Sequence, residues 1–180
     1  MEYEHCQNSR TIFYEAVRKY KPNALFILTR HTKLMETLMT TADMVVDNAV
    51  AVLDDLSKIV TDRVFVLNAI PYPTRTFEHD HTAALRAGKV LDQASYINKT
   101  VNLEMVRATV NRVVSLCSKC TVIDYAQVFA VNGTFHMFDD QTHLAYLNGY
   151  WHFTSHGLNQ LRPFFKQICD KVSYTNSNKH

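Results

Sequence analysis

The stretch "RVFVLNAIPYP", residues 63–73, decides the fold class. Its apolar run, 64–70, fits a strand that is buried on both faces, as the strands of parallel sheets are. The two prolines that follow lack the N–H that a strand ladder needs, so the strand is expected to stop before them. Similar apolar runs occur earlier, in "ALFILT" at 24–29, and later, in "CTVIDYA" at 120–126. The sequence therefore predicts three buried strands.

Apolar residues at helical spacing lie around and between these three runs. The clearest case is 41–60, where Val, Leu and Ile fall on one face and Asp and Lys on the other. The helices that we expect are 9–20, 41–60, a stretch near 80–93, 102–117 and 156–170. Helices that alternate with buried strands indicate an α/β protein with a parallel sheet.

Composition and charge exclude several classes of function. Of the 180 residues, 47% are hydrophobic and 20% are charged, and the net charge is +2 with Lys and Arg scattered along the chain. A nucleic-acid-binding protein would gather its basic residues into a stripe, so no nucleic-acid partner is expected. No apolar run approaches the roughly 20 residues that span a bilayer. We expect one domain over residues 1–173 and a disordered tail over 174–180.

Two Asn-x-Thr sequons make Asn98 and Asn132 candidate N-glycosylation sites. Such motifs receive glycans only in a secretory compartment, so they favour a luminal or extracellular glycoprotein. The histidines of "EHDH", His79 and His81, alternate along the chain. We expect both to be solvated rather than to bind a metal, because alternate residues on a loop face water and no third metal ligand follows at helical spacing.

The four cysteines are an even number and permit three pairings. Cys117 and Cys120 have C-x-x-C spacing but lack the second pair that a zinc site needs. Their expected setting, after a helix and before a strand, is the reverse of the usual redox motif. We therefore expect buried thiols or a disulfide at this pair.

Four blocks come in a characteristic order: "YKPNALFILTRH" at 20–31, "RVFVLNAIPYP" at 63–73, "SKCTVIDYAQVF" at 118–129 and "HFTSHGLNQLRPFF" at 152–165. Together they resemble the latter part of an SGNH domain. In particular, they resemble the SGNH domain on the C-terminal side of polytopic membrane O-acyltransferases in animals. The resemblance covers about residues 10–170, and its last block is the most specific.

This resemblance implies a three-layer, flavodoxin-like SGNH fold with a parallel sheet. The sheet order of such folds is 2-1-3-4-5, so the three strands expected here correspond to the contiguous strands 3-4-5. The resemblance therefore implies an incomplete domain. We expect an N-terminally truncated domain, a fragmentary gene product or a degenerate relative, with an exposed sheet edge where the first strand would pair.

The closing block is similar to the family pattern D-x-x-H-L-T-x-x-G-L. His152 matches its catalytic histidine, Thr154 its Thr and Gly157 its Gly, whereas Gly149 stands where the family has Asp. The upstream "DDQTH" offers an alternative pair, Asp140 and His143, at the same D-x-x-H spacing. We favour His152 over His143 because only His152 precedes a small-residue helix cap.

The nucleophile of the family has no counterpart in the sequence. An SGNH domain presents its serine on a G-D-S turn, and none of the four glycines precedes Asp-Ser. In a triad the serine attacks the acyl ester while the histidine takes its proton and the carboxylate orients the imidazole. With serine and carboxylate both missing, His152 is expected to be an ancestral general base rather than a working one.

The resemblance implies a domain of an O-acyltransferase or esterase that acts on hydroxyl groups and is inactive by itself. The alternative is a pseudoenzyme, a non-catalytic module that binds an acceptor or a partner through the former cleft. Expected partners are an acyl donor or acceptor, including a glycan, with no cofactor or metal. Membrane contact is expected only through a fused or missing transmembrane domain, which would place the chain on the luminal or extracellular side.

Overall fold

The computed structural model describes residues 2–31, 42–89, 91–100, 102–148 and 152–177. The chain divides into two compact units. The first contains the residues up to Ala69 together with Glu104–Ile123, and the second contains Ile70–Leu103 and the residues from Asp124 onward.

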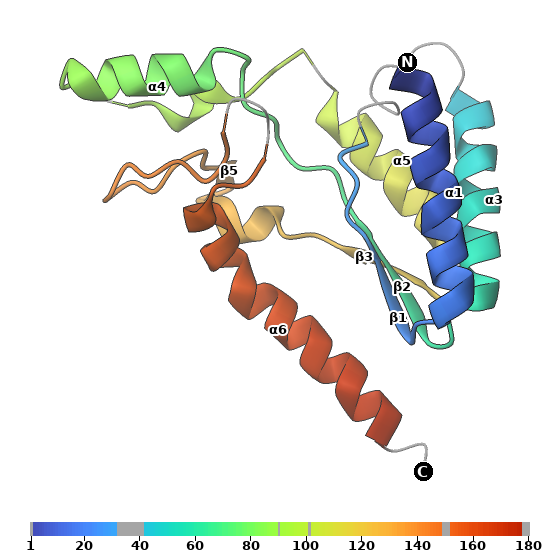
Figure 1. Cartoon of the computed structure of the whole chain (residues 1–180). Coiled ribbons are helices and arrows are strands. Elements are labelled where there is room, and N and C mark those ends of the chain that lie inside the picture. Colours follow the sequence, from blue (N-terminus) through green and yellow to red (C-terminus); the bar gives the residue numbers. More distant parts are fainter. Residues whose placement is uncertain (1, 32–41, 90, 101, 149–151, 178–180) are drawn as a thin grey trace. The chain divides into compact units, whose positions relative to one another are not determined.

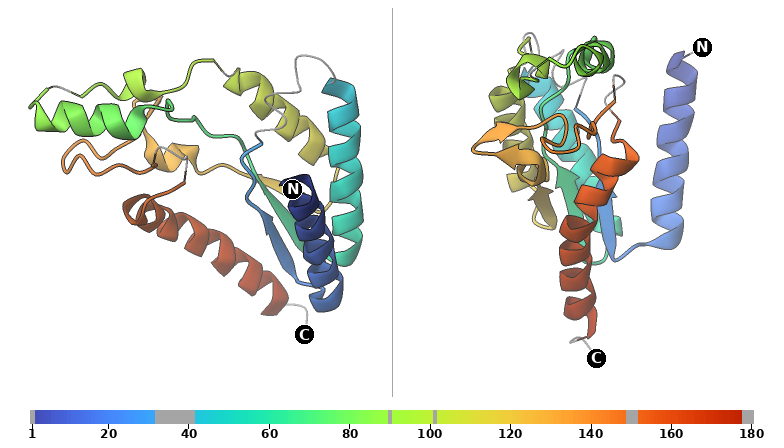
Figure 2. Two further views of the ribbon diagram at one scale, coloured as in Figure 1. Left: turned by 45° about the horizontal axis from the view of Figure 1, so that its top comes forward. Right: turned by 90° about the vertical axis from the view of Figure 1, so that its left-hand side faces the viewer.

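The first unit is built on a parallel sheet of three strands, β1 (Ala24–Ile27), β2 (Arg63–Leu67) and β3 (Cys120–Ile123). The strands lie side by side in the order β1-β2-β3 (Figure 1), and they remain adjacent in both views of Figure 2. Leu25 pairs with Val64, and Val64 pairs with Cys120. The predicted α/β class and the contiguous parallel strands are confirmed.

Three helices pack on one face of this sheet: α1 (Glu2–Tyr20), α3 (Ala42–Ile59) and α5 (Leu103–Ser115). Both crossovers step across the sheet in the same direction, and right-handed crossovers then place their helices on the same side. The core between helices and sheet consists almost entirely of branched aliphatic side chains. It comprises Val17, Val46, Leu53, Leu56, Val60, Val64, Val66, Val110, Val113 and Val114.

β2 ends at Leu67, earlier than the apolar run predicts. The cause is Asn68, which is only 3% exposed. Its Oδ1 accepts the backbone N–H of Ala69 at 2.9 Å, and its Nδ2 donates to Asn111 Oδ1 at 3.3 Å. The side chain thus satisfies a backbone donor that a longer strand would have paired, and the strand stops.

The sulfur atoms of Cys117 and Cys120 form a disulfide across the turn from α5 to β3. This confirms the expectation of buried thiols or a disulfide at the C-x-x-C pair. Between them, Lys119 donates from Nζ to the carbonyl oxygens of Ser57 and Val60, both at 2.8 Å. The lysine therefore caps the carboxyl end of α3, where a cation is favoured.

The second unit carries short elements and one long helix. They are α4 (Phe77–Arg86), η1 (Gln93–Tyr96), η2 (Ala126–Phe129), β4 (Ala130–Val131), β5 (Thr134–Phe135) and α6 (Ser155–Ser177). α4 stops before the predicted end because Gly88, with φ 59°, donates its N–H to the Leu85 carbonyl. A glycine in the left-handed region is a common helix terminator.

The second unit differs from the sequence prediction in two other places. β4 and β5 form an antiparallel hairpin around Asn132 and Gly133, both at positive φ, in a segment for which the sequence predicts no strand. Asn-Gly at two left-handed positions is typical of a tight hairpin turn. α6 continues to Ser177 with Pro163 inside it, so the helix extends into the predicted tail. None of the described helices is long and apolar enough to span a membrane.

Candidate active site

The backbone of His152 is hydrogen-bonded to Asn148 through both its N–H and its carbonyl group. The N–H of His152 donates to Asn148 Oδ1 at 3.0 Å, and the N–H of Asn148 donates to the His152 carbonyl at 2.8 Å. Leu147 and Phe153 form an antiparallel bridge beside them. Gly149, where the family pattern has Asp, lies outside the described residues. The backbone of His152 is therefore held firmly at the entrance to α6.

Thr154 forms the cap of α6 that its sequence predicts. Its Oγ1 accepts the N–H of Gly157 at 3.1 Å and donates to the Ala145 carbonyl at 2.6 Å. A cap of this kind pairs one of the donors that a helix start leaves free. The Thr and Gly of the closing block are thus explained by local structure, whether or not the histidine beside them reacts.

The side chain of His152 is exposed. Within the described part of the chain, no carboxylate and no hydroxyl hydrogen-bonds to its ring. In a working triad the imidazole is held between a carboxylate and the nucleophile. The described residues place neither group on His152, so what they provide there is a lone imidazole at the surface.

Asp140 meets a histidine that the sequence analysis did not single out. Its Oδ2 lies 3.0 Å from Nδ1 of His136, whose side chain is only 13% exposed. No hydrogen bond joins Asp140 to His143 among the described residues. The side chain of His143 is exposed, and its backbone has φ 58°. A carboxylate on Nδ1 is the arrangement that orients a catalytic imidazole, so His136 and Asp140 form a dyad of that type.

Gln93 on η1 holds this dyad to the rest of the second unit. Its Nε2 donates to Asp140 Oδ1 at 2.8 Å and to the Phe138 carbonyl at 2.9 Å. Its Oε1 accepts the N–H of Met137 at 2.8 Å. One buried amide therefore satisfies two backbone groups and fixes the orientation of the carboxylate. The sequence signal was weak, since a single Gln in a polar stretch is unremarkable.

Asp139, next to the dyad, organises the "DDQTH" turn and holds a half-buried tyrosine. Its Oδ1 accepts the backbone N–H and the hydroxyl of Thr142, which hold the pKa of the carboxyl below its usual range. Its Oδ2 accepts the hydroxyl of Tyr146 at 3.3 Å. Burial, followed by the charge of Asp139, raises the pKa of Tyr146 to about 12. Tyr146 therefore stays a neutral donor at physiological pH.

The expectation that His79 and His81 are both solvated is wrong for His81. Both lie on α4, where His81 follows Phe77 by one helical turn and shares its inward face. His81 is 6% exposed, and its ring centroid lies 4.7 Å from that of Phe138. Its Nε2 is buried without a hydrogen-bond partner in the described structure. The expectation places both histidines on a loop, whereas this segment is helical.

We expect His81 to make stability fall in acid. Burial, with the nearby charge of His143, lowers the pKa of His81 from the usual histidine value of 6.5. As pH falls below about 6.5, the unfolded chain takes up a proton that the folded chain refuses, so the free energy of unfolding decreases. Replacing His81 by Phe should remove this dependence. It should also stabilise the fold by about 1 kcal/mol at pH 7.5, because it removes an unpaired buried nitrogen.

Urea unfolding at pH 7.5 and pH 5 measures both effects. His79→Phe, on the exposed side of the same helix, is the matched control and should retain most of the wild-type pH dependence. A His81→Phe variant that loses stability in acid as steeply as the wild type would contradict the assignment.

The carboxyl end of the sheet in the first unit adjoins a cavity of about 290 Å³. Its walls are mainly aliphatic, and His31 supplies a polar group at its edge. His31 Nε2 lies 2.6 Å from the Leu67 carbonyl oxygen, and burial lowers its pKa. Ligands of open α/β folds bind at the carboxyl ends of strands. This edge of the sheet is therefore a second candidate location for a ligand-binding site. Its residues do not match the closing pattern of the SGNH family.

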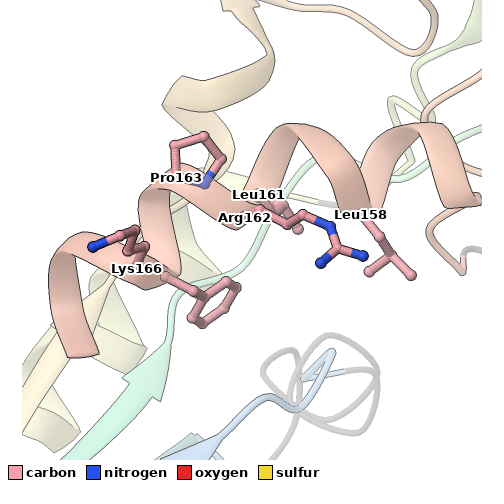
Figure 3. A pocket seen from close by; sticks show the side chains of 6 residues that line it. Leu158, Leu161, Arg162, Pro163 and Lys166 are labelled. Atoms are coloured by element: carbon pink, nitrogen blue, oxygen red, sulfur yellow. The ribbon is translucent and has the colours of Figure 1, made fainter. Parts of the chain in front are cut away.

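A hollow also runs along α6 in the second unit (Figure 3). Two cationic side chains, Arg162 and Lys166, lie among apolar ones on this stretch of the helix. The lining comprises Leu158, Leu161, Arg162, Pro163, Phe165 and Lys166. His152 is not part of it. No group of three or more His, Cys, Asp or Glu side chains in the described ranges is placed to hold a metal ion.

The comparison with protein families agrees with this fold. Residues 2–167 match the family model described as "SGNH domain (fused to AT3 domains)". No curated protein and no solved structure matches the chain. The match covers most of the sequence and includes the three parallel strands and the closing block at His152. The chain therefore belongs to the family of SGNH domains that are fused to AT3 acyltransferase domains.

Proposed function

We propose that this SGNH domain serves acyl transfer to or from hydroxyl groups within an O-acyltransferase, and that these 180 residues alone do not catalyse it. The observation that carries the proposal is the exposed ring of His152, to which no described carboxylate or hydroxyl is hydrogen-bonded. The sequence itself contains no G-D-S. Loss of the carboxylate function costs about 10⁴ in turnover, and loss of the serine about 10⁶.

The His136–Asp140 dyad does not alter this conclusion. It has the carboxylate that His152 lacks, but no hydrogen bond joins His136 to a serine or threonine hydroxyl among the described residues. An oriented imidazole without a nucleophile is a general base with nothing to activate. We therefore assign the dyad a structural role in the second unit.

We expect p-nitrophenyl acetate hydrolysis by the chain to be linear in ester concentration and close to that of surface imidazoles. His152→Ala should change the rate no more than His143→Ala, the matched exposed control, because neither ring has a triad partner. Initial rates over a range of ester concentrations measure this. Saturable turnover that drops tenfold or more in His152→Ala alone would overturn the proposal.

A non-catalytic binding module is the second candidate function. The cavity of about 290 Å³ beside His31 favours it, because an apolar pocket with few polar groups is the usual form of a small-molecule site. Such a module would bind an acyl group or an acceptor without turnover. Saturable binding of p-nitrophenyl acetate or its products without hydrolysis would favour this function over the first.

The proposal includes a location for the domain. An O-acyltransferase that modifies glycans or other cell-surface hydroxyls works on the luminal or extracellular side of a membrane. The disulfide between Cys117 and Cys120 supports that placement, because disulfides persist mainly in oxidising compartments.

A further inference from the structure

The sequon at Asn98 adopts a defined turn in the second unit. Asn98 Oδ1 accepts the backbone N–H of Thr100 at 2.9 Å and its hydroxyl at 2.7 Å. The backbone N–H of Asn98 donates to the Tyr72 carbonyl at 2.8 Å. The turn is therefore fixed from both sides. The side-chain carbonyl of Asn98 is engaged, whereas its amide nitrogen donates to no described residue.

This geometry leaves the acceptor atom of the sequon available. Asn98 is half-buried, and Lys99 and Thr100 are exposed, so the loop lies at the surface. A side-chain oxygen that accepts from the residue two positions later is an Asx turn. It keeps the amide of Asn98 next to the hydroxyl of Thr100, the two groups that define the Asn-x-Thr acceptor. A glycan on Nδ2 would break no hydrogen bond that holds this turn.

An independent observation in the first unit points to the same compartment. Cys117 and Cys120 are joined as a disulfide at the end of α5. Bonds of this kind are rare in the reducing cytosol and common where glycans are attached. The sequon and the disulfide lie in different units and have no structural reason to occur together. Passage through a secretory compartment accounts for both.

The second sequon provides an internal comparison. Asn132 occupies the tip of the β4–β5 hairpin with φ 50°, and Thr134 is already paired with Val131 in the ladder. No hydrogen bond between the Asn132 and Thr134 side chains accompanies this turn among the described contacts. Its exposed position is compatible with a glycan, but only Asn98 displays amide and hydroxyl together.

From these observations we propose that Asn98 carries an N-linked glycan. In the transfer, a bond forms between Asn98 Nδ2 and the anomeric carbon of an oligosaccharide supplied by a lipid-diphosphate donor. The bond from that carbon to the diphosphate oxygen breaks, the diphosphate leaves with the electron pair, and the amide loses one proton. The inference rests on the luminal placement proposed above and is independent of any acyl-transfer activity.

The test is expression of the full chain in eukaryotic cells behind a cleavable secretory leader, followed by peptide mapping. Enzymatic removal of the glycan by peptide N-glycosidase converts the modified Asn to Asp, which mass spectrometry locates. We expect most of the secreted chain to be modified at Asn98. Lys99→Pro and Thr100→Val should abolish the modification, whereas Lys99→Ala and Thr100→Ser should retain it.

The two pairs of variants separate recognition from folding. Lys99→Pro and Lys99→Ala alter the same exposed position, and only the first destroys the sequon. A secreted chain with the Cys117–Cys120 disulfide formed but with unmodified Asn98 would overturn the inference, as would a glycan on Asn132 alone. Because the leader delivers the chain to the lumen in every case, these outcomes do not depend on the esterase result.

Discussion

Replacing Gly157 by alanine should lower the free energy of unfolding by about 3 kcal/mol, although alanine usually stabilises a helix. An added Cβ would overlap the carbonyl oxygen of Tyr146 and lie 3.0 Å from its carbonyl carbon and 2.9 Å from Phe153 Cδ1. The Tyr146 carbonyl cannot retreat, because it accepts the N–H of Thr154 at 2.9 Å. In the variant this overlap should therefore push the start of α6 away from the segment that carries Tyr146.

Urea unfolding followed by circular dichroism measures this loss. Gly88→Ala is the matched control, because nothing lies within 4 Å of a Cβ there and the cost is only the positive φ of 59°, about 1–2 kcal/mol. Equal effects of the two substitutions would show that α6 does not depend on close contact at Gly157. The G of the closing block would then need an explanation other than packing.

Replacing Gln93 by leucine should destabilise the chain by about 4 kcal/mol. The substitution leaves the N–H of Met137 and the carbonyl of Phe138 without their side-chain partner, and both residues are at most 2% exposed. Each unpaired buried group costs about 1–3 kcal/mol. The carboxylate of Asp140 also loses a donor, so the His136–Asp140 dyad should lose its fixed geometry.

Two variants separate the amide from the size of the side chain. Gln93→Glu keeps an acceptor for Met137 but places a second carboxylate beside Asp140, so it should also destabilise, and more strongly at neutral pH than in acid. Gln141→Leu, on an exposed position of the adjacent turn, should change the free energy of unfolding by less than about 0.5 kcal/mol. A Gln93→Leu variant as stable as the wild type would refute the network.

Much of the fold could be predicted because its signals are local. The runs at 24–29, 64–70 and 120–126 have the length and continuous apolar character of buried strands, and all three are strands in the sheet. The cap at Thr154 could be predicted for the same reason, since a threonine and a glycine three residues later fix one helix start. Errors arose where side chains ended an element early, as Asn68 does for β2.

The fixed orientation of the dyad could not be predicted, although His136 and Asp140 are an i,i+4 pair, because a side chain from a distant segment holds the carboxylate. Gln93 and Asp140 are separated by 47 residues along the chain. The D-x-x-H spacing predicts His143 as the partner of Asp140. In the structure, Asp139 holds the turn and Asp140 lies against His136 instead. His81 was expected to face solvent because the sequence analysis placed it on a loop, whereas it lies on α4, which begins at Phe77.

The sequence alone determined the α/β class, the three parallel strands and the capped start of α6, because apolar periodicity and helix caps act between near neighbours in the chain. Only the tertiary structure decided that Gln93 holds Asp140, that His81 is buried and that Gly157 touches the Tyr146 carbonyl. These contacts depend on how separate segments pack, and packing joins residues that no spacing rule connects.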